Sequence, residues 1–578
     1  MQEKSLMFYM IRSELEDAVG VENVSTKEIE RAVYSVDYFW LGRKWQDAGE
    51  QGPMPDIIVR PGTTEEVSKV LKIANYYKIP VTTWGGGSGS QGGALPVAGG
   101  ILLDIKRLDK LIELNTEAGY VTCETGMIFA TLEDLVNEKG YSVMHLPSCM
   151  TCCTVGGALA HNGIGILSTK YGKMDDMCLS LEVVLPNGDI IHTLPVPKHS
   201  TGPNLIPFFI GSEGTLDIMT KAKFKIVRQP ETRIHHAFLF PDIHVGYQAC
   251  REIVQAVKPS IVRLFDEAET VSIIKKIIGF EKRGSFLNLT LEGYEKIVAA
   301  ELEIVLDIAK KYGAEDLGTE YGEKWFQNRI TFFYPDHIMD LPQMFGTLDT
   351  VATHDNIEKI YRAMKAAVED NFKQYGVRFI SHSSHWYDWG AMNYSRFIID
   401  NPPADPEEAL RVHKAINETG LPVVVLDSYD AEIMLQKYPE WGWEITAGVT
   451  TATAYVAKLL EEKKLEAKPA LGILGACHDD DRLARTFHEF APLRAMAQAA
   501  GYTLTEMFNH EKLSKSCGTA AAYSYMPELV TRIAGGRWED LTRTEAKAML
   551  VACPETLLCF GLCVPEGYQL VDLFGALL

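Results

Sequence analysis

Between residues 55 and 230, short apolar runs alternate with amphipathic segments, as they do in α/β regions. The clearest helix covers 63–79: Thr63 and Glu66 form a capping pair at its start, and apolar residues follow at helical spacing. A Pro-Gly pair ends the apolar run before this helix, and an Asn-Gly turn separates two later runs. Strands are expected over 56–62, 80–84, 101–105, 179–185 and 190–191.

The pattern changes after residue 230. Strands such as 234–240 and 377–386 alternate with amphipathic helices such as 295–313 up to about residue 435. The remaining residues are rich in Ala and Leu and predict mostly helix. We therefore expect an α+β protein in four parts: an N-terminal helical extension (1–53), a domain of two small α/β subdomains (54–230), an α+β domain (231–435) and a helical C-terminal region (436–578).

A glycine-rich stretch, TTWGGGSGSQGG at 82–93, follows the strand expected at 80–84. Its Gly87, Gly89 and Gly92 spell the G-x-G-x-x-G of a dinucleotide-binding Rossmann fold, which requires a helix directly after the loop. Here Pro96 and the pair Gly99–Gly100 leave no room for a helix before the strand at 101–105. A Rossmann fold is therefore excluded.

Two further glycine-containing segments, 147–191 and 208–227, also lie beside short strands. Glycine allows the backbone to approach a phosphate, and successive N–H groups form an anion-binding concavity. Each of these loops, taken alone, can be explained as an ordinary tight turn. Three of them together favour one polyanionic ligand held by backbone amides.

The composition limits the kinds of partner that the protein can bind. The net charge is −21, which argues against nucleic acid or an anionic membrane surface as a partner. The first 20 residues lack the apolar core of a secretory signal, and no apolar run is long enough to span a bilayer. Eleven cysteines, an odd number, fit a reducing compartment better than a disulfide framework. We expect a cytoplasmic protein without a membrane span; its oligomeric state stays open, with a homodimer as one expectation.

Five motifs in order carry a family resemblance. PDIIVRPGTTEEV, WGGGSGSQGG, LPSCMTCCTVGGALAHNGIG, KYGKMDDM with LEVVLPNGD, and FIGSEGTLDIMTKAKFKI resemble the PCMH-type FAD-binding domain of the vanillyl-alcohol-oxidase flavoprotein superfamily. Within it, the alkylglycerone-phosphate synthases and the D-lactate/glycolate dehydrogenases look most similar. The resemblance implies a larger antiparallel sheet over the flavin in 231–435, with 436–578 completing the flavin pocket.

The same resemblance assigns FAD-binding residues. It implies that Gly85, Gly86, Gly87, Ser88, Gly89, Ser90 and Gln91 surround the pyrophosphate. The isoalloxazine and ribityl side would be lined by Pro147, Ser148, Thr154, Gly156, Gly157 and Asn162, and the ribose and adenine end held by Glu213, Gly214 and Ile218. YSVD at 34–37 resembles an N-terminal motif of the same enzymes. FAD is expected to bind non-covalently, since His161 is only a remote candidate for attachment.

Catalytic candidates gather in SHSSHWYDWGAMNYSRF at 381–397. Flavin-dependent oxidation of an alcohol needs a base, a cation for an anionic substrate and correct placement over the flavin. We expect His385, Tyr387 and Tyr394 near the reacting carbon, and Arg396 or Arg329 beside a substrate anion. In a regular strand His385, Tyr387 and Trp389 would share one face, with Ser384, Trp386 and Asp388 on the other. Core packing is the alternative role for the aromatic residues, and a surface ion pair for Arg329.

Metal and iron–sulfur sites are not expected. The second metal-type histidine of the dehydrogenase motif is replaced by Asn393 and Tyr394. Neither Cys149, Cys152 and Cys153 nor the C-terminal group Cys553, Cys559 and Cys563 supplies four closely spaced thiolates. The histidine-bearing motifs that both related groups carry near the C-terminus are absent, and His478 or His510 with acidic neighbours are the only substitutes.

The sequence thus predicts an FAD-dependent oxidoreductase that oxidises a hydroxyl-bearing small molecule, such as a 2-hydroxy acid, and passes electrons to an unidentified acceptor. Two alternatives stay open. One is a non-redox transferase similar to the alkylglycerone-phosphate synthases. The other is a non-catalytic flavin-binding subunit of a larger complex.

Overall fold

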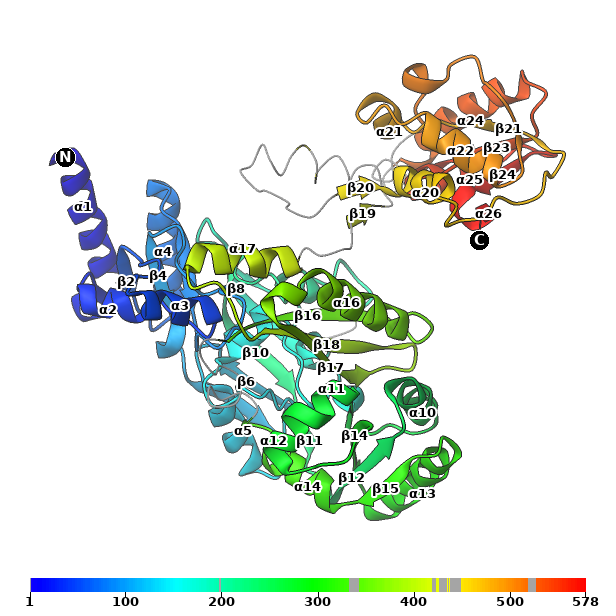
Figure 1. The fold of residues 1–578 in the computed structure, drawn as a ribbon. Coiled ribbons are helices and arrows are strands. Elements are labelled where there is room, and N and C mark those ends of the chain that lie inside the picture. Colours follow the sequence, from blue (N-terminus) through cyan, green and yellow to red (C-terminus); the bar gives the residue numbers. More distant parts are fainter. Residues whose placement is uncertain are drawn as a thin grey trace. The chain divides into compact units, whose positions relative to one another are not determined.

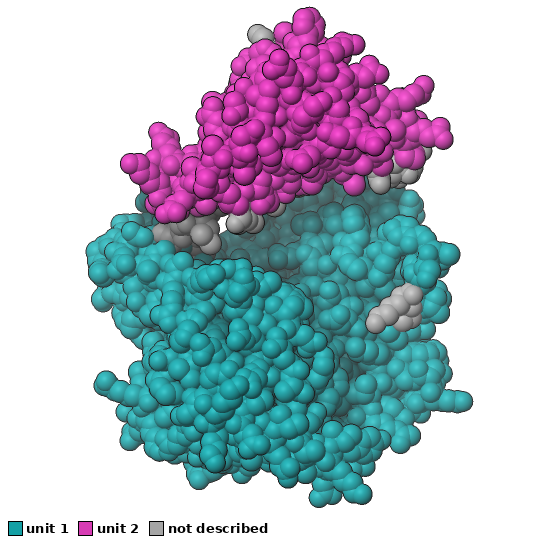
Figure 2. Space-filling view, turned by 90° about the vertical axis from the view of Figure 1, so that its right-hand side faces the viewer, with its two compact units in different colours: residues 1–417 teal, residues 418–578 magenta. Residues whose placement is uncertain are grey.

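The computed structural model describes residues 2–196, 199–331, 343–417, 423–425, 434, 436, 449–517 and 526–577. The chain forms two compact units, Met1–Asn417 and Glu418–Leu578 (Figure 2). The expected boundary at 230 therefore lies inside the first unit, whereas the one at 435 lies outside the described residues. Within the described ranges, no helix combines the length and the apolar character needed to cross a bilayer.

The first unit begins with a four-stranded sheet of order β1-β2-β4-β3. Strands β2 (Ile57–Val59), β4 (Ile101–Asp104) and β3 (Val81–Trp84) run parallel, and β1 (Val24–Ser25) adds antiparallel to β2. Helices α1 (Gln2–Val19) and α4 (Thr64–Tyr77) share a core with this sheet, and Thr63 caps α4 as expected. The N-terminal extension is thus part of this sheet and its core. The short helix α2 (Glu28–Val33) follows, whereas Trp40 and Leu41 of α3 (Trp40–Ala48) are buried in the apolar core of the large sheet described below.

A second, antiparallel sheet has the order β5-β6-β10-β8-β9. Its strands are β5 (Leu111–Asn115), β6 (Tyr120–Glu124), β10 (Ile218–Lys225), β8 (Cys178–Val184) and β9 (Ile190–His192). The pair β7 (Tyr141–Ser142) and β11 (Val227–Arg228) and the helices α5 (Phe129–Asn137), α6 (Val155–Ala160), α7 (Ser168–Tyr171), α8 (Met174–Met177) and α9 (Ile206–Phe209) accompany it. These are the two small subdomains that the sequence predicts.

The rest of the first unit is built on a seven-stranded antiparallel sheet of order β15-β12-β14-β13-β17-β18-β16. Its strands are β12 (Thr232–Phe240), β13 (Ile261–Phe265), β14 (Ser285–Gly293), β15 (Glu315–Gly318), β16 (Met344–Thr353), β17 (Val377–Trp386) and β18 (Gly390–Ile399). The helices are α10 (Ile243–Ala256), α11 (Glu267–Glu269), α12 (Lys275–Ile278), α13 (Glu295–Lys311), α14 (Glu320–Gln327), α16 (Ile357–Asn371) and α17 (Pro406–Asn417).

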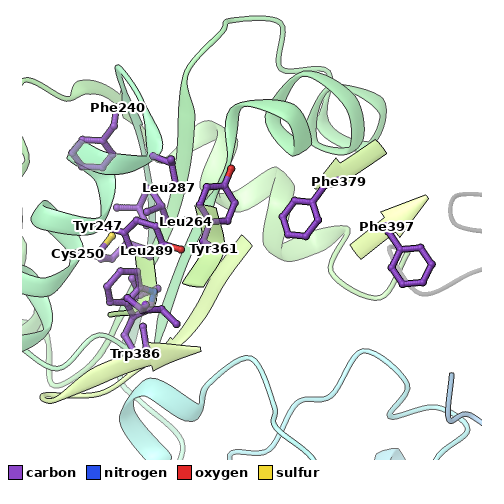
Figure 3. Close-up of a cluster of buried hydrophobic side chains, with 14 of the residues drawn as sticks. Phe240, Tyr247, Cys250, Leu264, Leu287, Leu289, Tyr361, Phe379, Trp386 and Phe397 are labelled. Atoms are coloured by element: carbon purple, nitrogen blue, oxygen red, sulfur yellow. The ribbon is translucent and has the colours of Figure 1, made fainter. Parts of the chain in front are cut away.

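The two faces of this sheet pack against different partners. Phe240, Leu264 and Leu287 point to the face covered by α10, α13 and α16, where they join a large apolar core (Figures 1 and 3). Their neighbours Phe265 and Phe286 point to the opposite face and pack with residues of the first 230. We call this opposite face the inner face, because it meets the glycine-loop domain.

The second unit contains a parallel sheet of order β22-β21-β23-β24, with β21 (Leu474–Cys477), β22 (Thr503–Thr505), β23 (Ala548–Val551) and β24 (Gln569–Asp572). A separate parallel pair joins β19 (Val423–Val425) to β20 (Val449–Thr451). The helices are α20 (Ala452–Glu461), α21 (Asp481–Arg485), α22 (Ala491–Ala499), α24 (Pro527–Thr542), α25 (Pro554–Gly561) and α26 (Leu573–Leu577). The prediction of a helical region missed these strands, which are short and contain the Ala and Leu residues that favour helix.

The two separate cores give a stability prediction. Leu287 is fully buried beside Leu264 and Leu289, so Leu287→Ala leaves a cavity there (Figure 3). We expect a loss of about 3 kcal/mol in the free energy of unfolding of the first unit, measured by chemical denaturation. Met549→Ala is the matched variant in the core of the second unit and should leave the first unit's transition in place. Equal destabilisation of both units by Leu287→Ala would contradict separate cores.

Candidate active site

The glycine loop that follows β3 lies directly against the segment before α6. A Cβ atom on Gly85 would lie 2.4 Å from Thr154 Oγ1, and one on Gly86 would lie 1.9 Å from the carbonyl oxygen of Cys152. Both distances are shorter than any real Cβ contact, so the loop reaches this position only because these residues are glycines. The first and second glycine-rich segments of the sequence are therefore adjacent in space.

The third glycine-rich segment joins the same place. The backbone N–H of Gly211 donates to Leu159 O at 3.1 Å, and that of Glu213 donates to Ala160 O at 2.9 Å. Both acceptors lie in α6, which Thr154 caps by accepting the N–H of Gly157. Glu213 has a φ of 52°, a conformation that such a side chain adopts rarely. Three segments that are far apart in sequence thus lie next to one another.

The N–H groups of the first loop are free to bind a ligand. Among the described residues, no protein acceptor receives a hydrogen bond from the backbone N–H of any residue from 85 to 91. A Cβ on Gly89 would meet nothing within 4 Å, so the loop borders open space. Seven unpaired N–H groups in one loop, with open space at Gly89, fit the pyrophosphate of FAD.

The YSVD segment at 34–37, with Tyr38 after it, contacts this loop and the end of β3. Tyr34 donates its hydroxyl to Asp104 at 2.7 Å and packs edge-on against Trp84 at 5.1 Å. The N–H of Tyr38 donates to Gly87 O at 2.9 Å. Gly87 has a φ of 62°, and a Cβ there would lie 2.6 Å from the Trp84 ring. The aromatic residues therefore fix the loop's curvature.

The other residues expected to bind FAD lie on the same three segments. Gln91 Nε2 donates to Thr347 Oγ1 of β16 at 2.7 Å and so connects the loop to the inner face. The N–H of Gly156 donates to Thr125 O at 2.7 Å, and Ile218 is buried at the start of β10. Ser88, Ser90, Pro147, Ser148, Asn162 and Gly214 lie on the three loops themselves. Their contacts with FAD stay predictions.

The inner face carries an unusual set of polar side chains opposite these loops. The strand register pairs Tyr394 of β18 with His382 of β17 on one side and with Asp349 of β16 on the other. Arg396 lies two residues further along β18, on the same face. Arg263 lies on β13, with its guanidinium 5.2 Å from the Trp325 ring. Together with Glu269 of α11 these residues form what we call the inner polar cluster: Arg263, Glu269, Asp349, His382, Tyr394 and Arg396.

Glu269 is the centre of this cluster. Asp266 caps α11 by accepting the N–H of Glu269 at 2.7 Å, which directs the Glu269 side chain under the sheet. The carboxylate forms an ion pair with Arg396 Nη2 and accepts a hydrogen bond from His382 Nδ1 at 3.1 Å. Burial opposes its ionisation, but Arg396 and His382 outweigh that effect and lower its pKa to about 2. Glu269 is therefore charged at any physiological pH.

His382 is neutral and has a defined tautomer. Burial lowers its pKa to about 4, although Glu269 acts in the other direction. A carboxylate can only accept, so Nδ1 carries the proton and Nε2 is left as an acceptor. The ring of Tyr394 stacks on His382 at 5.2 Å, and burial raises the pKa of Tyr394 to about 12. The pair thus presents one acceptor and one hydroxyl donor.

The expectation that His385, Tyr387 and Trp389 share one strand face is wrong. The register shifts between Ser384 and Trp386, and His385 has a φ of 57°, which marks a bulge. Past the bulge Trp386 turns into the apolar core, opposite to the inner face (Figure 3). His385 Nδ1 is hydrogen-bonded to Ser168 of α7, and burial keeps its pKa well below the usual value.

The structure brings together only part of the expected catalytic set. Tyr394 and Arg396 lie in the inner polar cluster, and His385 lies next to it. Tyr387 instead stacks on the exposed Trp389 at 5.1 Å, beyond the end of β17. Arg329 packs on the Phe326 ring at 4.2 Å, beside His235 of β12, which lies three strands away from β17. Roles for Tyr387 and Arg329 stay predictions.

Arg263, Glu269 and Asp349 lie outside the segment that carries the catalytic candidates, and His382 lies within it but was not among the residues expected to act. Arg263 and Asp349 are charged residues within strands of otherwise mixed character. In a sequence, such residues look like ordinary solvent-facing positions of a strand. Glu269 follows Asp266 at the spacing of a helix cap, which was the only available signal. Pairing across β13, β17, β18 and β16 creates the cluster, and a single sequence does not reveal that pairing.

His478 and Asp479 of the second unit each pair with an arginine of the same unit. His478 Nδ1 accepts from Arg537 Nε at 3.2 Å, and Asp479 pairs with Arg494 at 2.7 Å. Across the described residues of both units, no three His, Cys, Asp or Glu side chains are grouped as a metal site. His478 is thus held within the fold of the second unit.

The close approach at Gly86 gives a direct prediction. In Gly86→Ala the new methyl group must displace the Cys152 carbonyl, so the two loops separate. We expect purified Gly86→Ala protein to contain less than a tenth of the wild-type FAD, measured from the 280/450 nm absorbance ratio, about 450 nm being the visible flavin band. Gly535→Ala, whose Cβ would meet nothing within 4 Å, is the control. Full FAD content in Gly86→Ala would show that the cradle is placed wrongly.

Comparison with known proteins agrees with this geometry. Residues 55–194 match the family model described as "FAD binding domain". The protein named "Uncharacterized FAD-linked oxidoreductase YgcU" from Escherichia coli (strain K12) is 29% identical over 72% of this chain and 87% of its own length. "Glycolate oxidase subunit GlcD" from Bacillus subtilis (strain 168) is 31% identical over 54% of this chain and 66% of its own.

Solved structures show the same fold. A structure of alkyldihydroxyacetonephosphate synthase is 25% identical, with a TM-score of 0.61 over 70% of this chain and 78% of its own. p-Cresol methylhydroxylase, at 19% identity, has a TM-score of 0.59 over 79% of this chain and 92% of its own, which supports the fold alone. These findings confirm the expected fold class and FAD as the cofactor. Residues 55–194 are thus an FAD-binding domain, and the chain is similar to FAD-linked oxidoreductases.

Proposed function

We propose that the protein oxidises the hydroxyl-bearing carbon of a small carboxylate, a 2-hydroxy acid. The observation that carries the proposal is Arg396, which is 8% exposed and lies on the inner face opposite the glycine loops. Its Nη2 is held by Glu269, while its Nε has no partner among the described residues. A buried guanidinium with an unused donor is suited to a substrate carboxylate.

The charge of the inner polar cluster also favours an anion. Arg263 and Arg396 carry two positive charges, Glu269 carries one negative charge, and His382 is neutral. The side chain of Asp349 is exposed to solvent. Desolvation by the protein around it nevertheless raises its pKa to about 7. When Asp349 is protonated, the cluster has a net charge of +1. A bound carboxylate would neutralise it.

His382 and Tyr394 supply the proton chemistry in this proposal. FAD, when bound, supplies a hydride acceptor at its N5 atom. His382 Nε2 accepts the proton of the substrate hydroxyl, and the fixed tautomer with Nδ1–H directed at Glu269 stabilises the resulting imidazolium. Tyr394 donates its hydroxyl to the substrate oxygen. His382 takes the role first considered for His385, whose Nδ1 is already hydrogen-bonded to Ser168.

A second function is supported by the likeness to alkyldihydroxyacetonephosphate synthase. The same cationic face can receive a phosphate instead of a carboxylate, and the reaction would then be a transfer without net oxidation. The two functions differ in one observable, namely net reduction of the flavin by the substrate. A non-catalytic flavin subunit would show neither reaction.

The test is anaerobic mixing of holoprotein with 2-hydroxy acids of increasing chain length. We expect one of them to bleach the flavin absorbance band near about 450 nm, with the 2-oxo acid as product. A panel that leaves the band unchanged while an acyl ester of a hydroxyketone phosphate exchanges its acyl group would favour the transferase. Inactivity towards both substrate classes and towards simple alcohols would contradict both functions.

Arg396 gives a quantitative prediction. Lysine keeps the charge but loses the planar fork, so Arg396→Lys removes the free Nε donor. We expect kcat/KM to fall about tenfold to a hundredfold, because a hydrogen bond to a charged group contributes about 1.5–3 kcal/mol. Arg378→Lys alters an exposed arginine paired with Asp400 and should leave kcat/KM within twofold. Equal effects of the two substitutions would contradict the assigned role.

The raised pKa of Asp349 leads to a prediction for the pH dependence of KM. Its carboxyl is neutral below its pKa of about 7 and negatively charged above it, where it opposes an anionic substrate. We expect KM for the 2-hydroxy acid to rise several-fold between pH 6 and pH 8, as Asp349 ionises. Asp349→Asn should flatten this profile at the low-pH value. An unchanged slope in Asp349→Asn would assign the pH dependence to another group.

A further inference from the structure

Three cysteines share one turn next to the flavin-binding loop. The backbone N–H groups of Cys152 and Cys153 both donate to Cys149 O, at 2.9 and 2.8 Å. The turn is anchored on α5, because the carbonyls of Met150 and Cys153 accept the N–H groups of Ala130 and Phe129 at 2.9 and 3.0 Å. The three thiols are therefore held close together by backbone that cannot shift freely.

The thiols of this turn also affect one another. Cys152 Sγ donates to the carbonyl oxygen of Cys149 at 3.3 Å, and the thiols of Cys149 and Cys153 shift each other's pKa in opposite directions. Cys149 is half-buried, so small molecules reach it, whereas Cys153 is 5% exposed. Cys250, by comparison, is fully buried in the apolar core. A reachable thiol with a second thiol behind it is the arrangement of a redox pair.

The electrostatics support different roles for the two sulfurs. The Cys153 thiol acts against burial and lowers the pKa of Cys149, which favours the Cys149 thiolate. The Cys149 thiol and burial both raise the pKa of Cys153. Cys149 is thus the nucleophile and Cys153 the thiol that resolves its oxidised form.

We propose that Cys149 and Cys153 form a redox-active thiol pair that a hydroperoxide converts to a disulfide inside the flavin-binding site. The Cys149 thiolate attacks one peroxide oxygen, the O–O bond breaks, and Cys149 becomes a sulfenic acid while the alcohol or water leaves. The Cys153 sulfur then attacks the Cys149 sulfur, the S–S bond forms, and hydroxide leaves with the Cys153 proton as water. In total, two thiols and one hydroperoxide give one disulfide, one alcohol or water, and one water.

The disulfide would act on the flavin site through Gly86. The Cys152 carbonyl lies where a Gly86 side chain would be, so the two loops are in close contact. Bringing the two sulfurs to the S–S bond length of about 2.05 Å tightens the turn that carries this carbonyl. Oxidation should therefore loosen the hold on FAD. This inference rests on the FAD-binding domain and does not depend on the proposed substrate.

The test treats FAD-loaded full-length protein with hydrogen peroxide and maps the peptides without reduction. We expect the peptide that contains residues 149–153 to lose two hydrogens, and FAD to pass a size-exclusion filter more readily. Cys152→Ser should still form the disulfide. Cys153→Ser should stop at a sulfenic acid that dimedone traps, and Cys149→Ser should show neither product.

The controls separate this site from others. Cys250→Ser should behave as wild type. A disulfide between Cys517 and Cys559 of the second unit would join two different tryptic peptides and is thus distinguishable. The absorbance spectrum of each variant before oxidation verifies that FAD is bound. A disulfide that survives Cys153→Ser, or a Cys149 that dimedone labels no faster than Cys250 does, would overturn the proposal.

Discussion

The buried carboxylate of Glu269 is the interaction on which the proposed chemistry depends. It holds Arg396 by an ion pair and fixes the tautomer of His382, and it partly neutralises the charge of Arg263. Without it, two arginines would be enclosed on one sheet face without a counter-charge, which is costly in a low dielectric. The capping carboxylate of Asp266 sets its position, so a helix cap in the large sheet's inner layer determines the geometry of the site.

Helix α7 makes several of the polar contacts between the glycine-loop domain and the seven-stranded sheet. Ser168 hydrogen-bonds to His385, Thr169 Oγ1 accepts from the N–H of Trp386 at 3.2 Å, and Lys170 reaches the carbonyl of Glu292. The bulge at His385 is therefore one of the points at which the two domains are joined, together with the Gln91–Thr347 hydrogen bond and the packing of Phe265 and Phe286. A bulge next to an active site redirects a strand while its neighbours keep their pairing. Trp386 can then fill the core while Ser384 and His382 face the opposite way.

Sequence patterns predicted the local elements well. Thr63 capped α4 as expected, the strands at 81–84 and 101–104 flanked the glycine loop, and no helix followed that loop. Long-range pairing was the source of the errors. The bulge at His385, the partner of Arg396 and the parallel sheet of the second unit all depend on which strands lie side by side. Hydrophobic periodicity contains no information on that choice. A glycine loop is visible in one short stretch of sequence, whereas the inner polar cluster is assembled from several strands and a helix.

The central claim is that the free N–H groups of residues 85–91 and the inner polar cluster face one bound flavin from opposite sides. The most direct measurement is an experimental structure of the FAD-bound protein with an unreactive dicarboxylate such as oxalate. We predict the pyrophosphate on the 85–91 backbone and an oxalate carboxylate on Arg396, with His382 Nε2 directed at the ligand. A dicarboxylate bound away from Arg396, or a pyrophosphate away from this loop, would contradict the account.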